Sequence, residues 1–293
     1  MGVVTGLEIR EWREDDAPGL ASARPGDEAA DPILAHDAIR PVHGRMDPAE
    51  PWLRSLTAEI DGTPVGAGAL WSARWHPARL WIYVEVVPGW RRQGVGTALV
   101  GALRRVGEPD GRPLRAKVRP GAPSGAFAAS VGLGTVLIES TGRELDPAAL
   151  PEPPDRVLAA DLGSAGVAGT FRRWYAAVHP TDPPGALSDE DVWDTHLGEA
   201  AGGVIVHLDW GAPAGVGLVF DEGEEWVFSG GSLTPDRPEA ADLARDLILG
   251  AAALVPAGRR LVLEVDDSMA DVAAAADLLG ASYGDTCQVV AES

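Results

Sequence analysis

Residues 84–97 decide the fold, and they read Val-Glu-Val-Val-Pro-Gly-Trp-Arg-Arg-Gln-Gly-Val-Gly-Thr. The β-branched run before Pro88 predicts a buried strand that ends at the proline. Gly94 and Gly96 then precede apolar residues at helical spacing over 97–106. Glycines at the start of a helix leave backbone N–H groups unobstructed, and the positive end of the helix dipole attracts anions. The stretch therefore predicts a site for a phosphate or pyrophosphate group.

Two well-known phosphate loops do not fit this stretch. A Walker loop needs Gly-Lys followed by Ser or Thr, and the dinucleotide fingerprint needs three glycines. The spacing Val86-x-Pro88-x-x-Arg91-x-x-Gly94-x-Gly96 instead resembles the acetyl-CoA-binding motif of the GNAT family of N-acetyltransferases. The flanking order is also similar to that of the family, because a hairpin precedes the motif and a helix, a strand and a second helix follow it.

The chain is long enough for two domains, with 293 residues. Residues 146–155 contain four prolines, which fix an extended path typical of a linker. Similar patterns recur on both sides of this break. We therefore predict an α+β fold of two tandem GNAT-like domains, each with a mixed, mostly antiparallel sheet flanked by helices. The N-terminal, acyl-CoA-binding domain is expected over residues 1–147, a Pro-rich linker over 148–154, and a degenerate C-terminal GNAT-like domain over 155–293.

Alternating patterns and turn signals predict the remaining elements. Strands are expected over residues 7–13, 55–61, 64–71, 80–87 and 114–118 in the first half, and over 203–210, 214–221, 225–230, 261–265 and 286–291 in the second half. Helices are expected over residues 97–106 and 239–254.

The resemblance implies that acetyl-CoA, or another short acyl-CoA, is the co-substrate. By that resemblance, the backbone of Val84 and Val86 pairs with the pantetheine arm, and the following turn wraps the pyrophosphate. The residues of that turn are Arg91, Arg92, Gln93, Gly94, Val95, Gly96 and Thr97. The implied reaction is direct transfer, in which an amine attacks the thioester within a ternary complex.

Transfer to an amine requires a base, because an alkylammonium with a pKa near ~10 is mostly protonated at pH 7. Glu85 is the nearest carboxylate, and it shares one face of the predicted strand with Trp81 and Tyr83. We expect Glu85 to accept the proton directly or through water. The alternative is a structural ion pair between Glu85 and a neighbouring arginine.

The predicted acid departs from the family pattern. Many members carry a tyrosine four residues before the glycine of the closing helix, where its hydroxyl protonates the leaving thiolate; this sequence has Ala128 there. Tyr83 is a rival acid, and unassisted departure is a third reading because a thiolate with a pKa near ~8.5 is a tolerable leaving group. A noncatalytic acyl-CoA-binding or regulatory protein is the alternative function.

Aromatic residues and charge suggest the acceptor. Trp71, Trp75 and His76 lie in or beside the connection between two strands and are the candidate substrate-binding residues, with core packing as the alternative. The net charge of −20 attracts cationic amines, so a small-molecule amine is the expected acceptor. Protein N-termini, lysines and hydroxyl groups are further alternatives.

Composition narrows the remaining functional classes. Up to Leu150 there are 17 basic and 19 acidic residues, against 7 and 25 afterwards, which disfavours nucleic-acid binding. A single cysteine and six scattered histidines give no metal-ligand spacing, so no metal is expected. No apolar run is long enough for a membrane span, no signal sequence is recognisable, and we expect a cytoplasmic protein without a membrane partner.

The second half lacks the phosphate-binding residues. A shift of 147 residues places Ala241 and Leu243 where Gly94 and Gly96 stand, and it places Ser232 at the position of Glu85. Side chains at such positions obstruct the close approach of a pyrophosphate, and the surrounding acidic residues repel it. We therefore predict that only the first half binds acyl-CoA.

Overall fold

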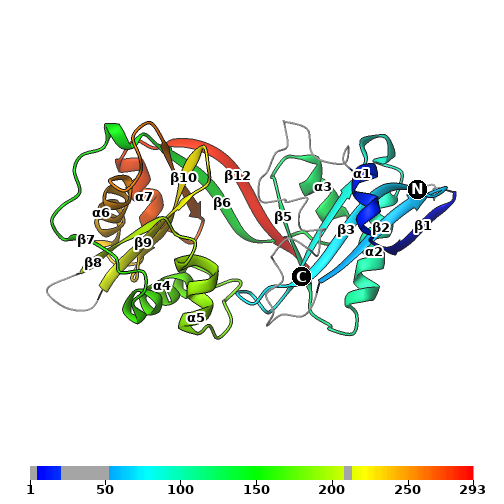
Figure 1. Ribbon diagram of the computed structural model, residues 1–293, viewed down its shortest axis with the longest axis horizontal. Coiled ribbons are helices and arrows are strands. Elements are labelled where there is room, and N and C mark those ends of the chain that lie inside the picture. Colours follow the sequence, from blue (N-terminus) through cyan, green and yellow to red (C-terminus); the bar gives the residue numbers. More distant parts are fainter. Residues whose placement is uncertain (1–4, 21–52, 208–212, 293) are drawn as a thin grey trace. The chain divides into compact units, whose positions relative to one another are not determined.

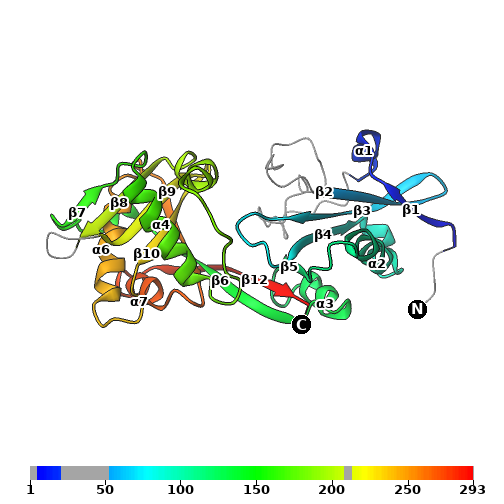
Figure 2. The same cartoon turned by 90° about the horizontal axis from the view of Figure 1, so that it is seen from below.

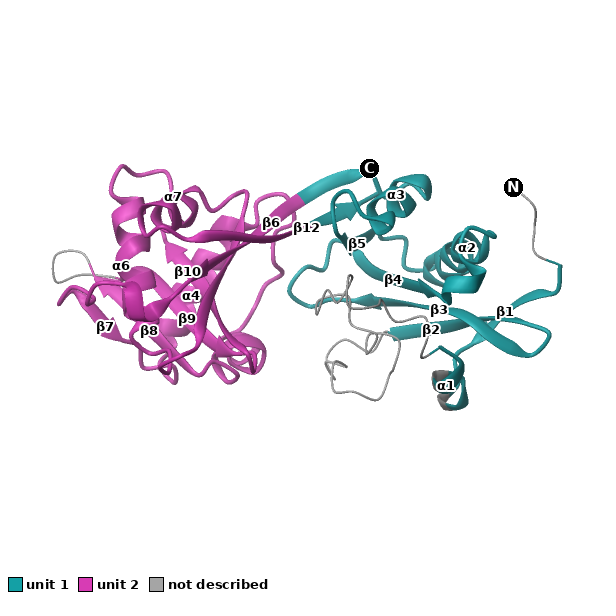
Figure 3. Cartoon of the chain, turned by 90° about the horizontal axis from the view of Figure 1, so that it is seen from above, with its two compact units in different colours: residues 1–137, 288–293 teal, residues 138–287 magenta. Residues whose placement is uncertain are grey.

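The computed structural model describes residues 5–20, 53–207 and 213–292. They form two compact units, which Figure 3 colours separately. Unit 1 comprises residues 1–137 and 288–293, and unit 2 comprises residues 138–287. The predicted α+β class is confirmed, because helices flank a mixed, mostly antiparallel sheet. Within the described ranges, no helix has the length and apolar character needed to cross a membrane.

The sheet of unit 1 has the strand order β1-β2-β3-β4-β5-β12 (Figure 1). Neighbouring strands are antiparallel except for the parallel pair β4 and β5. The elements of this unit are β1 Leu7–Glu11, α1 Ala17–Leu20, β2 Leu53–Ile60, β3 Thr63–Ser72, β4 Leu80–Val86, α2 Val95–Gly107, β5 Leu114–Val118 and α3 Pro123–Ser130, together with the end of β12 Ser282–Ala291.

Helix α2 covers one face of this sheet, and two glycines in β3 allow its close approach. An added Cβ at Gly66 would lie 3.2 Å from a side-chain carbon of Val95, and one at Gly68 would lie 2.9 Å from Leu103. Both partners are buried residues of α2. The main core of unit 1 forms where α2 and α3 meet the sheet, and this packing fixes the position of the start of α2.

Helix α1 lies on the opposite face of the same sheet, as Figure 2 shows. Leu20 at its end is 1% exposed and packs against Ala67 and Ala69 of β3 and Tyr83 of β4. The small side chains of β3 leave room for this contact. The two faces of β4 therefore have different neighbours, with α2 on one side and a small cluster around Leu20 on the other.

The compact units differ from the predicted division at both ends. Strand β6, Thr135–Leu145, precedes the proline-rich segment, yet residues 140–145 pair with β11 in unit 2. In the opposite direction, residues 288–291 at the end of β12 pair with β5 in unit 1. Each unit therefore completes its sheet with a strand that lies outside its predicted sequence range. Long-range hydrogen bonding between strands overrides the local linker signal.

Unit 2 has the strand order β12-β6-β11-β10-β9-β8-β7. Strand β6, strand β7 and helix α4 were not predicted from the sequence. The end of the predicted strand 203–210 lies outside the described residues. The further elements are β7 Val157–Ala159, α4 Ala165–Val178, α5 Asp189–Val192, β8 Gly202–His207, β9 Pro213–Asp221, β10 Glu225–Ser232, α6 Ala240–Ala252, β11 Arg260–Asp266 and α7 Ala270–Leu278.

Candidate functional site

Strand β4 has an edge that β5 leaves uncovered. In the described strands, β4 and β5 pair at two register positions, Leu80 with Leu114 and Trp81 with Arg115, at the beginning of each strand. The pairing of β4 with β3 continues to Val86. The second half of β4 therefore lies beside an opening in the sheet.

Backbone groups of Val84 and Val86 point toward this opening. The Val87 N–H donates to the Val65 carbonyl at 2.9 Å, so those two residues form a hydrogen-bonded pair of the antiparallel ladder. Hydrogen-bonded and non-hydrogen-bonded pairs alternate along such a ladder. Val84 and Val86 consequently direct their N–H and C=O groups away from β3, although Arg91 Nε already donates to the Val86 carbonyl at 2.9 Å. The two N–H groups suit an extended polar ligand laid along β4.

The turn after β4 presents the start of α2. Arg92 and Gly94 both have positive φ, of 66° and 88°, and α2 begins immediately after Gly94. Gly94 accepts the first helical hydrogen bond from the Ala98 N–H at 2.9 Å. The N–H groups of the first turn have no helical carbonyl to bind, which makes this end of α2 suited to an anion.

The side chains around this turn differ in exposure. Arg91, Arg92, Gln93 and Thr97 are exposed, whereas Val95 is buried in the core and offers the turn only its backbone. Gln93 closes the turn by donating from Nε2 to the Gly89 carbonyl at 2.9 Å.

Gly96 has a packing role that the sequence did not reveal. A Cβ at this position would lie 3.0 Å from the ring of Phe127, a residue of α3, so the glycine lets α3 approach the first turn of α2. Ala128 follows Phe127 in α3 and is buried. The nearby Ser130 hydroxyl donates to the Phe127 carbonyl at 2.7 Å.

Glu85 and Tyr83 meet on the face of β4 that is turned away from α2. The Tyr83 hydroxyl donates to Glu85 Oε2 at 2.9 Å, and the residues are 9% and 6% exposed. Burial, the charge of Glu85 and this hydrogen bond raise the pKa of Tyr83 above its usual value. The phenol therefore stays protonated at neutral pH and holds one oxygen of Glu85 in place.

The aromatic residues occupy two different settings. Trp71 and Trp81 are stacked with their ring centroids 6.2 Å apart, and the Arg115 guanidinium lies 4.0 Å from the centroid of the Trp81 ring. The Arg115 guanidinium therefore covers one face of the Trp81 ring. Trp75 and His76, in the connection between β3 and β4, are 7% and 8% exposed. Trp71 is therefore the most exposed of the three proposed acceptor-binding residues.

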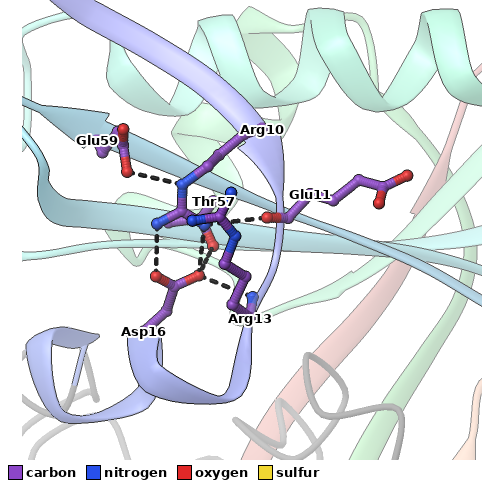
Figure 4. Close-up of polar contacts among 6 residues, drawn as sticks. All are labelled: Arg10, Glu11, Arg13, Asp16, Thr57 and Glu59. Carbon is purple, nitrogen blue, oxygen red and sulfur yellow. Dashed lines mark hydrogen bonds and ion pairs between the residues drawn. The ribbon is translucent and has the colours of Figure 1, made fainter.

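A buried ion pair attaches the turn directly before α1, residues 14–16, to the same face of the sheet (Figure 4). Asp16 is 2% exposed, and its carboxylate binds two nitrogens of Arg10, at 2.6 and 2.8 Å. The same carboxylate accepts hydrogen bonds from the Thr57 hydroxyl at 2.8 Å and from the Arg13 N–H at 2.9 Å. Sequence analysis missed this network because its members come from three separate segments.

Unit 2 repeats the strand arrangement and corrects the predicted correspondence. The Leu233 N–H donates to the Ala214 carbonyl at the end of β10, as the Val87 N–H does to Val65 at the end of β4. Counting back two residues from each of these donors shows that Gly231, rather than Ser232, is the residue of unit 2 that corresponds to Glu85. At the helix start, Glu239 caps α6 where Gly94 caps α2. The two copies follow no single offset, because the turn between strand and helix differs in length.

Side chains close the corresponding opening in unit 2. Strand β10 pairs with β11 over Glu225–Phe228, and beyond it the Ser232 N–H donates to Asp271 Oδ2 at 2.9 Å. Trp174 fills the space beside Gly231, where a Cβ would lie 2.8 Å from its Nε1. Burial raises the pKa of the Asp271 carboxyl, and hydrogen bonds from backbone N–H groups oppose this shift. The groups that would face a ligand in unit 2 are thus already engaged.

No group of three or more potential metal-binding side chains occurs among the residues that the structure describes.

Among curated proteins, none matches the sequence significantly. The whole chain is nevertheless similar in fold to solved N-acetyltransferases. A GCN5-related N-acetyltransferase from Sphaerobacter thermophilus has a TM-score of 0.65 at 17% identity, over 99% of this chain and 96% of that one.

Two further structures share this fold. A GCN5-related N-acetyltransferase from Kribbella flavida has a TM-score of 0.54 at 15% identity, covering 97% of this chain and 70% of that one. A tandem GNAT protein from the clavulanic acid biosynthesis pathway has a TM-score of 0.55 at 20% identity, covering 97% and 98%. Residues 7–121 match the model of the acetyltransferase (GNAT) family. The chain therefore carries a GNAT-family acetyltransferase domain over these residues, which confirms the resemblance predicted from residues 84–97.

Proposed function

We propose that unit 1 transfers an acetyl or other short acyl group from CoA to the amine of a small molecule, in a ternary complex. The observation that carries this proposal is the placement of the Glu85 carboxylate on the strand whose free edge borders the opening beside β5. The proton acceptor, Glu85, and the backbone donors, Val84 and Val86, thus belong to the same three consecutive residues.

The residues present fit acyl-CoA. The N–H groups of Val84 and Val86 suit the pantetheine arm, and the first turn of α2, with Arg91 and Arg92 beside it, suits the pyrophosphate. When bound, acyl-CoA supplies an activated thioester carbonyl. A backbone N–H of β4 aimed at that carbonyl stabilises negative charge that develops on its oxygen.

Glu85 prepares the amine in this proposal. It takes a proton from the ammonium form of the acceptor, directly or through water, and so produces the neutral nucleophile. Tyr83 acts as a positioning residue, because its hydroxyl already donates to Glu85 Oε2. Its raised pKa favours this role over that of a general acid. The strong net negative charge of the chain favours a cationic acceptor.

We assign no general acid to protonate the CoA thiolate as it leaves. Ala128 carries no proton to donate, and the Ser130 hydroxyl is bonded to the Phe127 carbonyl. We therefore propose that CoA leaves as the thiolate, whose conjugate acid has a pKa near ~8.5, and is protonated by solvent.

Glu85→Gln tests the proposed base. The substitution preserves size but cannot accept the proton, so turnover should fall ~10²-fold or more at neutral pH. The deficit should shrink at high pH, where more of the amine is already neutral. Affinity for CoA, measured by calorimetry, should stay unchanged. Glu8→Gln, on the exposed side of β1, is the matched control.

Wild-type turnover in the Glu85→Gln variant would remove Glu85 from the mechanism. A parallel loss of CoA affinity would assign it a structural role instead. Tyr83→Phe should lower turnover less, by ~10-fold, since it frees the Glu85 carboxylate without removing it.

A noncatalytic acyl-CoA-binding protein is the second candidate, and Ala128 at the usual position of the tyrosine favours it. A panel of amines incubated with acetyl-CoA and the protein separates the two functions. Thiol release that depends on one amine supports the enzyme, whereas stable acetyl-CoA binding without thiol release across the panel supports the binding protein.

A further inference from the structure

Glu292, near the end of the chain, contacts two elements of the candidate site. Its Oε1 accepts a hydrogen bond from Arg104 Nε at 2.8 Å, and its Oε2 accepts one from the Leu114 N–H at 2.8 Å. The Glu292 N–H donates to the Leu114 carbonyl at 3.0 Å. Arg104 belongs to the last part of α2, and Leu114 is the first residue of β5. One carboxylate therefore joins α2 to β5.

Arg104 extends this connection to α3. Its Nη2 donates to the Val131 carbonyl at 2.5 Å, and Val131 caps the C-terminal end of α3. The three joined elements are the walls of the proposed acyl-CoA site. Helix α2 presents the first-turn N–H groups, β5 borders the opening beside β4, and α3 packs Phe127 against Gly96.

The end of β12 also controls where β5 lies. Residues 288–291 of β12 pair with residues 115–118 of β5, and of these four β5 residues only Arg115 also pairs with β4. Four register positions hold β5 on the β12 side, against two on the β4 side. The width of the opening beside Val84 and Val86 thus depends on residues at the C-terminal end of the chain.

We propose that residues 288–292 are a positioning element of the acyl-CoA site, and that Glu292 makes its most important contacts. They hold β5 and α2 at the separation from β4 that the pantetheine arm requires. The inference rests on the proposed function. It extends the site to residues that lie well outside the matched GNAT range of 7–121.

The Glu292 contacts suit positioning better than global stability. Its side chain is 27% exposed and that of Arg104 is 37% exposed, and ion pairs with this exposure contribute little to folding stability. The bond to the Leu114 N–H is charge-assisted and directional, which restricts the geometry of β5. Removing the carboxylate should therefore change ligand affinity more than the melting temperature.

Glu292→Ala and Glu292→Gln test this inference by calorimetry with two probes, CoA and adenosine 3′,5′-bisphosphate. The second probe lacks the pantetheine arm. We expect Glu292→Ala to weaken CoA binding about tenfold and the nucleotide less than twofold. Glu292→Gln keeps one oxygen for the Leu114 N–H, so its loss of CoA affinity should be smaller, about threefold.

Asp110→Ala is the matched control. Asp110 pairs with Arg112 in the connection between α2 and β5 at a similar exposure, but that pair joins residues of a single turn. We expect this variant to bind CoA as the wild type does.

Unchanged CoA affinity in Glu292→Ala would overturn the inference and leave the proposed function standing. So would an equal loss of both probes, because that result indicates general damage to unit 1 rather than misplacement of β5. A wild-type protein that binds no CoA would overturn the proposed function and this inference together.

Discussion

Gly94 offers a direct test of the proposal that the turn before α2 binds an anion. Its φ of 88° lies in the left-handed region, and α2 begins at the next residue. Asn and Asp enter that region more readily than other side chains do, so Gly94→Asn and Gly94→Asp should preserve the turn at similar strain. The two variants have nearly the same shape and differ by one negative charge. Their difference in CoA affinity isolates the electrostatic contribution.

Coulomb's law gives the expected magnitude. A carboxylate about 6 Å from one phosphate charge, at an effective dielectric constant of about 20, costs about 3 kcal/mol. Because 1.4 kcal/mol corresponds to a factor of ten, Gly94→Asp should bind CoA ~10²-fold more weakly than Gly94→Asn. Without ligand the order reverses, since an acidic residue at a helix N-terminus stabilises the helix by about 0.3–1 kcal/mol.

Calorimetry with CoA and thermal unfolding without ligand measure both effects. Opposite orders of affinity and stability exclude partial unfolding as the reason for weaker binding. Glu239→Gln, at the N-cap of α6 in unit 2, is the control and should leave CoA affinity unchanged. If Gly94→Asp binds CoA within threefold of Gly94→Asn, the first turn of α2 does not hold the pyrophosphate.

Two further outcomes follow from the structure. Hydrogen bonds from Arg10, Arg13 and Thr57 outweigh burial and lower the pKa of the Asp16 carboxyl. Its contribution is therefore complete above the unfolded pKa of about 3.9 and lost as pH falls through the folded value. Asp16→Asn should destabilise unit 1 by about 2 kcal/mol at pH 7, and in urea unfolding this deficit should shrink below pH 4; a constant deficit would contradict the assignment. Calorimetric titration of the wild type with CoA should saturate at one equivalent per chain, because Asp271 takes the Ser232 N–H and Glu239 caps α6; two equivalents would contradict this.

The sequence was sufficient for the features that depend on neighbouring residues. The strand that ends at Val86, the turn with Gly94 and the apolar face of α2 all follow from local patterns, and the structure confirms these elements. A glycine at a helix start and a β-branched run have direct conformational consequences within a few residues. The GNAT resemblance was recognisable for the same reason.

Tertiary structure alone decided which distant segments complete each part. The pairing of β12 with β5, the contacts of Glu292 and the Asp16 network join residues far apart in the chain. The residue of unit 2 that corresponds to Glu85 is Gly231, whereas a fixed sequence offset predicted Ser232. Strand register depends on cross-strand hydrogen bonds, which a fixed offset does not represent. Local patterns therefore determined the type of each element, whereas packing and long-range pairing determined its partners.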